Sequence, residues 1–90
     1  MDSPQHPRLR DGLELRLLPD GVALLDLDTE AVHVLNPSAA FILEGLDGTR
    51  DRSSLALELA EAVPGLDPAQ AALDVDECLT TLTQLGLLAT

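Results

Sequence analysis

Lysine, tryptophan and tyrosine are absent from this chain of 90 residues, and Phe41 is its one aromatic residue. All five basic residues are arginines, against 16 acidic residues, so the formal net charge is −11. Proteins bind nucleic acid by neutralising phosphates with Lys and Arg, so this charge excludes a nucleic-acid partner. Anionic membrane surfaces are disfavoured for the same reason.

Cysteine and histidine are almost as scarce. Cys78 is the single cysteine, so no disulfide can form within the chain. His6 and His33 lie far apart in sequence, and no metal-ligand spacing is present. No run approaches the ~18 apolar residues that span a bilayer, and the N-terminus lacks the apolar core of a signal peptide. We therefore expect a cytoplasmic protein with no metal, no cofactor and no membrane partner.

Recognisable catalytic motifs are missing as well. The sequence contains no Gly-rich phosphate loop and no nucleophile elbow. Asp74, Asp76 and Glu77 are close in sequence but point in different directions on a helix, so we interpret them as a solvated face. A domain of this size, with its apolar residues in one core, has little left to line a catalytic pocket. We expect that the chain is not an enzyme by itself.

The hydrophobic period changes within residues 31–48. Val32 and Val34 alternate with their neighbours, as in a strand. Asn36 and Pro37 then form a typical helix start, with Asn as the N-cap and Pro at the first helical position. The pattern predicts a strand that leads directly into a capped helix.

The whole pattern predicts a small α+β domain of three antiparallel strands followed by three helices (βββααα). Residues 1–12 are expected to form a flexible N-terminal tail, and residues 13–90 a single domain. The expected strands and helices cover residues 13–18, 22–27, 31–35, 37–46, 52–63 and 68–85.

The third helix carries the strongest boundary signals: Asp67 as the N-cap, Pro68 at its first position and Gly86 as its stop. At 100° per residue, one apolar stripe forms the expected core face. The stripe consists of Ala71, Val75, Cys78, Leu79, Leu82 and Leu85. Leu73 falls outside it, beside Asp76 and Thr80. It is either an ordinary exposed leucine or part of a second contact surface.

The third strand can lie at the edge of the sheet, and residues 31–35 contain no Pro, Lys or Arg that would block pairing with another strand. With the third helix beside this edge, the two elements would form a groove for an extended peptide. The stretch from Asp20 to Asp47 contains no basic residue, which favours a peptide with Lys or Arg near its bound segment. An exposed edge also permits dimerisation, so monomer and dimer both stay open.

Several segments resemble the PqqD family in their order and spacing. They are residues 21–28 (GVALLDLD), 34–40 (VLNPSAA), 46–50 (LDGTR), 74–75 (DV) and 82–88 (LTQLGLL). This family is the precursor-peptide recognition element in the biosynthesis of ribosomally made, post-translationally modified peptides. The resemblance implies a winged-helix-like fold and a non-catalytic peptide chaperone. Such a chaperone binds the leader of a precursor as an added strand and presents it to a modifying enzyme.

The resemblance also implies the partners and the position of the site. The partner enzyme would be a radical S-adenosylmethionine enzyme or a leader peptidase. The strand side of the groove would be Ala31, Val32, His33, Val34 and Leu35. For the helix side, the helical geometry selects Leu73, Asp76 and Thr80.

Two alternatives from other classes are an acyl or peptidyl carrier protein and an acidic protein–protein interaction domain. A carrier needs a serine for phosphopantetheine at the start of its second helix, and Ser53 and Ser54 before Leu55 stand at such a place. However, the usual Asp-Ser-Leu pattern is missing, and the first 35 residues are typical of strands. A winged-helix DNA-binding protein is opposed by the net charge.

Overall fold

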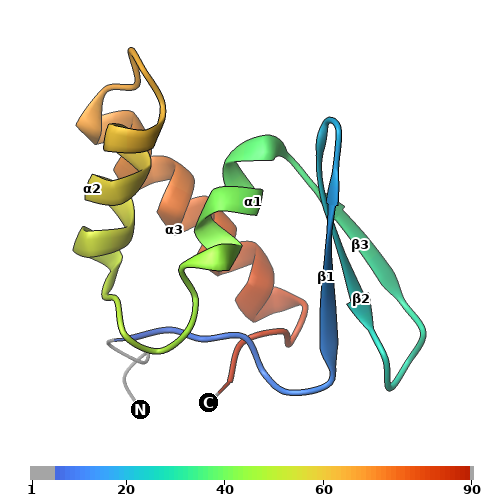
Figure 1. Cartoon of the computed structure of the whole chain (residues 1–90). Helices are drawn as coiled ribbons and strands as arrows, with labels where there is room; N and C mark the ends of the chain where they lie inside the picture. Colours follow the sequence, from blue (N-terminus) through green and yellow to red (C-terminus); the bar gives the residue numbers. More distant parts are fainter. Residues whose placement is uncertain (1–5, 90) are drawn as a thin grey trace.

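The computed structural model of the chain describes residues 6–89 (Figure 1). The elements follow the expected α+β order of three strands and three helices, which confirms the predicted fold class. They are β1 (Leu13–Leu18), β2 (Gly21–Asp26), β3 (Val32–Leu35), α1 (Pro37–Glu44), α2 (Arg52–Ala62) and α3 (Pro68–Gln84). The predicted boundaries are correct to within two residues.

The three strands form one antiparallel sheet in the order β1-β2-β3, so β3 is an edge strand. Leu24 in the central strand pairs with Leu15 on one side and His33 on the other. Ala31, which the sequence placed in the third strand, lies just before it, because the chain turns sharply at Glu30 (φ 63°). The β2–β3 connection therefore positions the start of the free edge.

Each helix begins at the side chain that the sequence predicted as its cap. Asn36, Asp51 and Asp67 accept backbone N–H groups at 2.9, 2.8 and 3.0 Å, which satisfies donors that have no partner within a helix. α3 ends where Gly86 adopts a φ of +73°, a conformation that glycine tolerates best. Local capping chemistry therefore sets the point where β3 passes into α1.

One hydrophobic core fills the space between the sheet and the helices. α3 contributes Ala71, Val75, Leu79 and Leu82, four residues of the predicted stripe. The other two lie less deeply: Cys78 is partly buried, and Leu85 is exposed because it caps the helix at the point where the chain turns back. The turn returns the fully buried Leu87 to the core.

Residues 8–10 pair with the domain, whereas a flexible tail was expected over residues 1–12. The Leu9 N–H donates to the Leu46 carbonyl at 3.2 Å, and the Arg10 N–H donates to the Leu87 carbonyl at 3.0 Å. Leu9 also packs against the core. Residues 1–5 of the expected tail lie outside the described residues.

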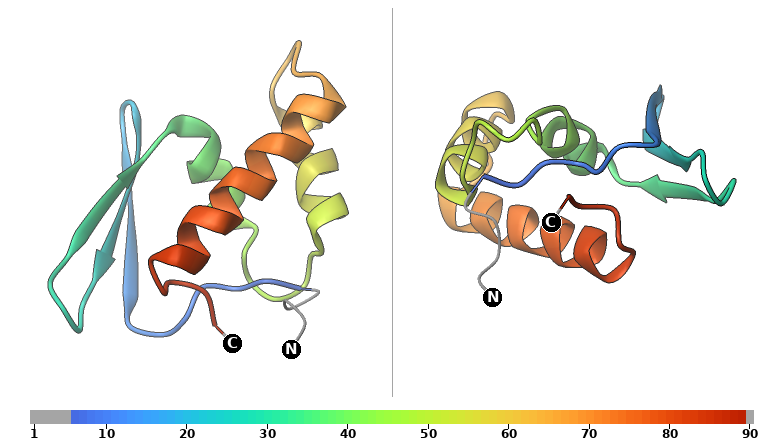
Figure 2. Two further views of the ribbon diagram at one scale, coloured as in Figure 1. Left: turned by 180° about the vertical axis from the view of Figure 1, so that it is seen from behind. Right: turned by 90° about the horizontal axis from the view of Figure 1, so that it is seen from below.

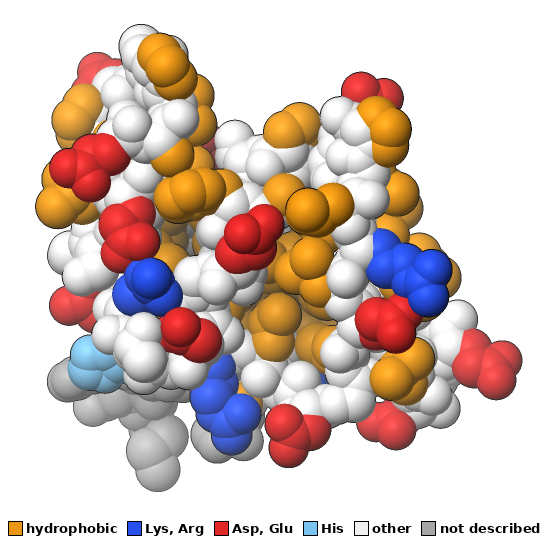
Figure 3. All heavy atoms as spheres, in the orientation of Figure 1, with side chains coloured by type: hydrophobic (Ala, Val, Ile, Leu, Met, Phe, Trp, Pro, Cys, Tyr) orange, Lys and Arg blue, Asp and Glu red, His pale blue; other side chains and the backbone are white. Residues whose placement is uncertain are grey.

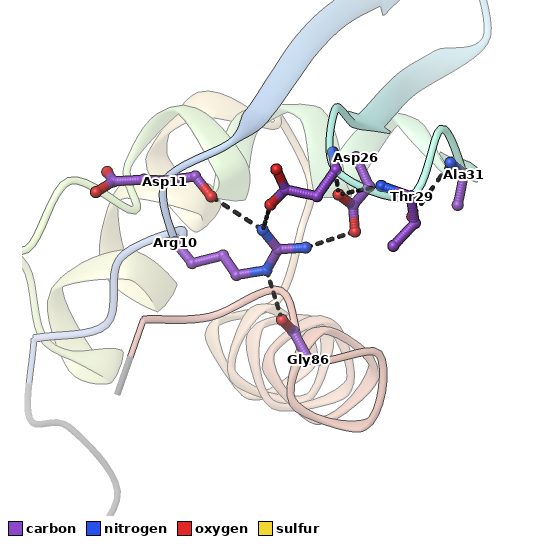
Figure 4. A network of polar contacts seen from close by, with 7 residues as sticks. Arg10, Asp11, Asp26, Thr29, Ala31 and Gly86 are labelled. Atoms are coloured by element: carbon purple, nitrogen blue, oxygen red, sulfur yellow. Dashed lines mark hydrogen bonds and ion pairs between the residues drawn. The ribbon is translucent and has the colours of Figure 1, made fainter.

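The Arg10 side chain joins three segments that are distant in sequence (Figure 4). Its Nε donates to the Gly86 carbonyl at 2.9 Å, and its Nη2 forms an ion pair with the Asp26 carboxylate. Asp26 is the one buried charged residue of the described chain, and it also accepts the backbone N–H groups of Asp28 and Thr29. Arg10 and Asp26 therefore tie the N-terminal segment and the end of α3 to the turn that precedes β3.

This contact makes the stability of the fold depend on pH. Desolvation alone would raise the pKa of the Asp26 carboxyl, but the N–H groups of Asp28 and Thr29 and the charge of Arg10 hold this pKa below its ordinary value. A carboxyl whose pKa is lowered by folding stabilises the fold above its unfolded pKa of roughly 3.9. That stabilisation is lost as the pH falls through the folded pKa.

An Asp26→Asn variant should consequently melt at a lower temperature than wild type at pH 7, and the difference should shrink below about pH 4. Circular dichroism melting curves at neutral and acidic pH measure this directly. Asp28→Asn is the control, because Asp28 is exposed and its contact with Arg10 is long, at 3.5 Å. A difference between Asp26→Asn and wild type that does not change with pH would contradict the assignment.

Candidate functional site

The outer edge of β3 presents backbone groups that are not used by the sheet. The Asp26 N–H donates to the Ala31 carbonyl at 2.8 Å. This bond shows which alternate residues of β3 direct their backbone groups toward β2. In an antiparallel pair, alternate residues direct their backbone groups toward the partner strand. His33 and Leu35 therefore face β2, whereas Val32 and Val34 direct N–H and C=O outward. The edge thus offers two donors and two acceptors to another strand.

The side chains of β3 divide between the two faces of the sheet. His33 and Leu35 are partly buried and lie on the face that also carries the core residues of β2. Val32 and Val34 lie on the opposite face and are 58% and 67% exposed. An added strand would place alternate side chains on these two faces in the same way.

A hollow lies where β3 passes into α1 and α3 runs past that junction. We call it the β3–α3 hollow, and its volume is about 130 Å³. Its walls come from these two helices and the end of β3: Leu35, Asn36, Ser38, Ala39, Ile42, Asp74, Glu77, Cys78 and Thr81. Small-molecule sites usually measure ~300–1,000 Å³, so this hollow has the size of a site for one side chain.

β3 and α3 lie on the same side of the molecule, and β1 and α1 lie on the other (Figure 2). The α3 residues of the hollow (Asp74, Glu77, Cys78 and Thr81) follow helical spacing and share one face of that helix. Burial raises the pKa of the Cys78 thiol to about 11. The thiol therefore stays protonated at neutral pH and forms part of the apolar wall.

The structure brings only part of the predicted site together. Of the residues predicted on the strand side, Leu35 lines the hollow, and Val32 and Val34 form the free edge. Ala31 and His33 lie along the same strand path. The Ala31 carbonyl accepts from β2 while its N–H donates to the Thr29 hydroxyl at 3.3 Å, and His33 pairs with Leu24 of β2.

None of the residues predicted on the helix side (Leu73, Asp76 and Thr80) lines the hollow. Asp76 forms an ion pair with Arg52 of α2 at 2.5 Å, so it faces α2 instead of β3. Leu73 and Thr80 are exposed on α3. Asp74 and Glu77 line the hollow in their place; Glu77 is exposed and Asp74 is half-buried, which is consistent with the solvated face expected from the sequence. The sequence does not show on which side of the α3 core face the free edge of β3 lies, and the choice of helix residues depends on that.

Two kinds of feature are absent from the described part of the chain. Within residues 6–89, no group of three or more His, Cys, Asp or Glu side chains is arranged to hold a metal ion. None of the helices there combines the length and the apolar character needed to cross a membrane.

The family model for coenzyme PQQ synthesis protein D (PqqD) matches residues 21–88. The chain belongs to the PqqD family. This confirms the resemblance that the separate sequence segments indicated. Among curated proteins, none matches the chain.

Solved structures similar to this PqqD-family domain include the PqqD part of Methylobacterium extorquens PqqCD, determined in solution by NMR. That structure is described as a stand-alone recognition element for ribosomally synthesized and post-translationally modified peptides. It is 28% identical, with a TM-score of 0.75 over 93% of this chain and 88% of that chain.

Two further structures share the fold. TbiB1 in complex with the TbiA(beta) leader peptide is 20% identical, with a TM-score of 0.75 over 90% of this chain and 93% of that chain. A lasso peptide synthetase B1 complexed with its leader peptide is 24% identical, with a TM-score of 0.77 over 94% of this chain and 99% of that chain.

Proposed function

We propose that this PqqD-family domain binds the leader of a precursor peptide as a strand added to β3, and presents the precursor to a modifying enzyme. The observation that carries the proposal is the free outer edge of β3, with the β3–α3 hollow beside it. Family membership supports it, as do the relatives solved with leader peptides.

In this proposal the leader pairs with the N–H and C=O groups of Val32 and Val34. Backbone pairing along an edge supplies affinity and register, and pockets for alternate side chains supply selectivity. One set of leader side chains would lie next to Val32 and Val34 on the open face. The other set would point toward Leu35 and the hollow. The helix side of the site is then formed by Asp74, Glu77 and Thr81, in place of Leu73, Asp76 and Thr80.

The domain would act by binding and not by catalysis. The β3–α3 hollow has the size of a site for one side chain, and the Cys78 thiol beside it stays protonated at neutral pH. The chemistry would belong to the partner, for which a radical S-adenosylmethionine enzyme and a leader peptidase are the two candidates. The carrier-protein alternative has no support, because strands and not helices form the first part of the chain.

A Val34→Pro variant tests the strand addition, because proline removes the outward N–H without removing a hydrogen bond to β2. We expect its affinity for a leader peptide that the wild-type domain binds to fall at least about tenfold. Isothermal titration calorimetry gives the affinities, and a melting curve shows that the variant is folded.

Val34→Thr is the matched control, since it retains both the N–H and the β-branched shape. Its affinity should stay close to that of wild type. If folded Val34→Pro binds the leader as tightly as wild type does, the leader does not pair along β3.

A further inference from the structure

The β3–α3 hollow is lined by apolar, neutral polar and acidic side chains. The apolar ones are Leu35, Ala39, Ile42 and Cys78, and the neutral polar ones are Asn36, Ser38 and Thr81. Asp74 and Glu77 line the hollow from α3, and we call these two carboxylates the acidic rim. Apolar side chains beside two carboxylates suit a Lys or Arg side chain, which has an apolar stem and a cationic head.

No cation of the described chain neutralises this rim. In residues 6–89, Arg10, Arg16, Arg50 and Arg52 form ion pairs with other carboxylates, and no ion pair there includes Asp74 or Glu77. Among the described residues, Asp74 accepts a single hydrogen bond, from the neutral Gln70 amide at 2.9 Å. α3 itself contains no basic residue.

The N-terminus of α1 opposes this charge only in part. A helix N-terminus is equivalent to roughly half a positive charge, whereas Asp74 and Glu77 carry one full negative charge each. The hollow is therefore negative on balance. It repels an acidic side chain, and when a purely apolar side chain enters, its two carboxylates have no cationic partner.

We infer that the β3–α3 hollow receives a Lys or Arg side chain of the segment bound along β3. This inference rests on the proposed function and adds to it a specific requirement in the leader: one cationic residue that points toward α3. It differs from a general attraction between an acidic protein and a basic peptide, because it assigns the preference to Glu77 and Asp74 and to one position of the peptide.

The probe is a display library of random peptides, selected separately on wild type, Glu77→Gln and Asp76→Asn. Asp76→Asn is the matched control, since it makes the same change in net charge on the same helix, but Asp76 faces Arg52 and not the hollow. We expect peptides selected on wild type and on Asp76→Asn to share one position rich in Lys or Arg. Selection on Glu77→Gln should weaken this preference.

The affinity of one selected peptide then measures the effect. Glu77→Gln should weaken binding about twofold to fivefold, as expected for an exposed ion pair. It should have no such effect on a copy of the peptide with norleucine in place of the cationic residue. Asp76→Asn should leave both affinities unchanged.

Failure of the inference and failure of the proposed function give different results. Selected peptides that shift the Val34 amide resonance but share no cationic position would overturn the inference and leave strand addition standing. Equal effects of Glu77→Gln and Asp76→Asn would also overturn it, because they would indicate a general charge effect. If no peptide shifts the resonances of β3 in the folded domain, the proposed function is wrong and the inference with it.

Discussion

A Gly21→Ala variant should lose roughly 1–3 kcal/mol of stability, the range typical of added atoms in a packed site. Gly21 begins β2, and a Cβ atom there would lie 2.1 Å from the Leu35 carbonyl oxygen and 3.3 Å from the Asn36 carbonyl carbon. Both contacts are backbone atoms at the junction of β3 and α1. The clash cannot be relieved by rotating a side chain, so β3 or the start of α1 must move.

Because Leu35 also lines the hollow, Gly21→Ala should weaken peptide binding together with stability. For a domain of this size, we expect the melting temperature to fall by roughly 5–20 °C. Asp20→Ala is the control, since it changes an exposed neighbour in the same turn and should cost little. If Gly21→Ala melts at the wild-type temperature, β3 does not pass as close to Gly21 as the structure places it.

A Leu79→Asp variant should be largely unfolded. Leu79 is 1% exposed and lies at the centre of the α3 core face. Removing a buried leucine side chain costs about 2–5 kcal/mol, and an unpaired charge in the same place adds a desolvation penalty. A domain of this length has a total stability on the order of 5–13 kcal/mol, so the substitution removes most or all of it.

Leu73→Asp introduces the same residue into the same helix, at a position that is 54% exposed. It should remain folded. It also tests the prediction from the sequence that Leu73 belongs to the helix side of the peptide groove. We expect it to bind peptide normally, because Leu73 does not line the hollow. Far-ultraviolet circular dichroism measures whether each variant retains its helices. A folded Leu79→Asp variant would show that α3 packs on the core through another face.

The sequence was sufficient to predict the elements, because their signals are local. The caps at Asn36, Asp51 and Asp67 depend on a side chain and a backbone N–H within three residues. The core face of α3 follows from helical periodicity alone. The exposed position of Leu73 follows from the same periodicity.

The α3 residues that lie beside the free edge of β3 could not be predicted in the same way. Helical geometry places Asp74 and Asp76 on different faces of α3, but it does not say which of them turns toward β3. That choice depends on how α3 packs against α1 and α2. The ion pair between Asp76 and Arg52 reports this packing, and it joins residues 24 positions apart.

The N-terminal segment shows the same limit. Arg10 contacts Gly86, which is 76 positions away, and Asp26, which is 16 positions away. No periodic pattern or turn signal marks these pairs. A short segment with prolines at positions 4 and 7 is typical of a loose tail, and only the folded structure shows that residues 8–10 pair with the domain.

Figure 3 shows that hydrophobic side chains reach the surface in more than one place, including an area between α1 and β1. The central claim is that the leader uses the opposite side of the molecule, along β3. An NMR titration of the labelled domain with a leader peptide that it binds, followed by measurement of cross-strand nuclear Overhauser effects, tests this most directly. We predict contacts from Val32 and Val34 to the peptide backbone, together with shifts at Glu77 and Thr81. Contacts confined to β1 or to the Leu73 face of α3, with β3 unchanged, would contradict the account.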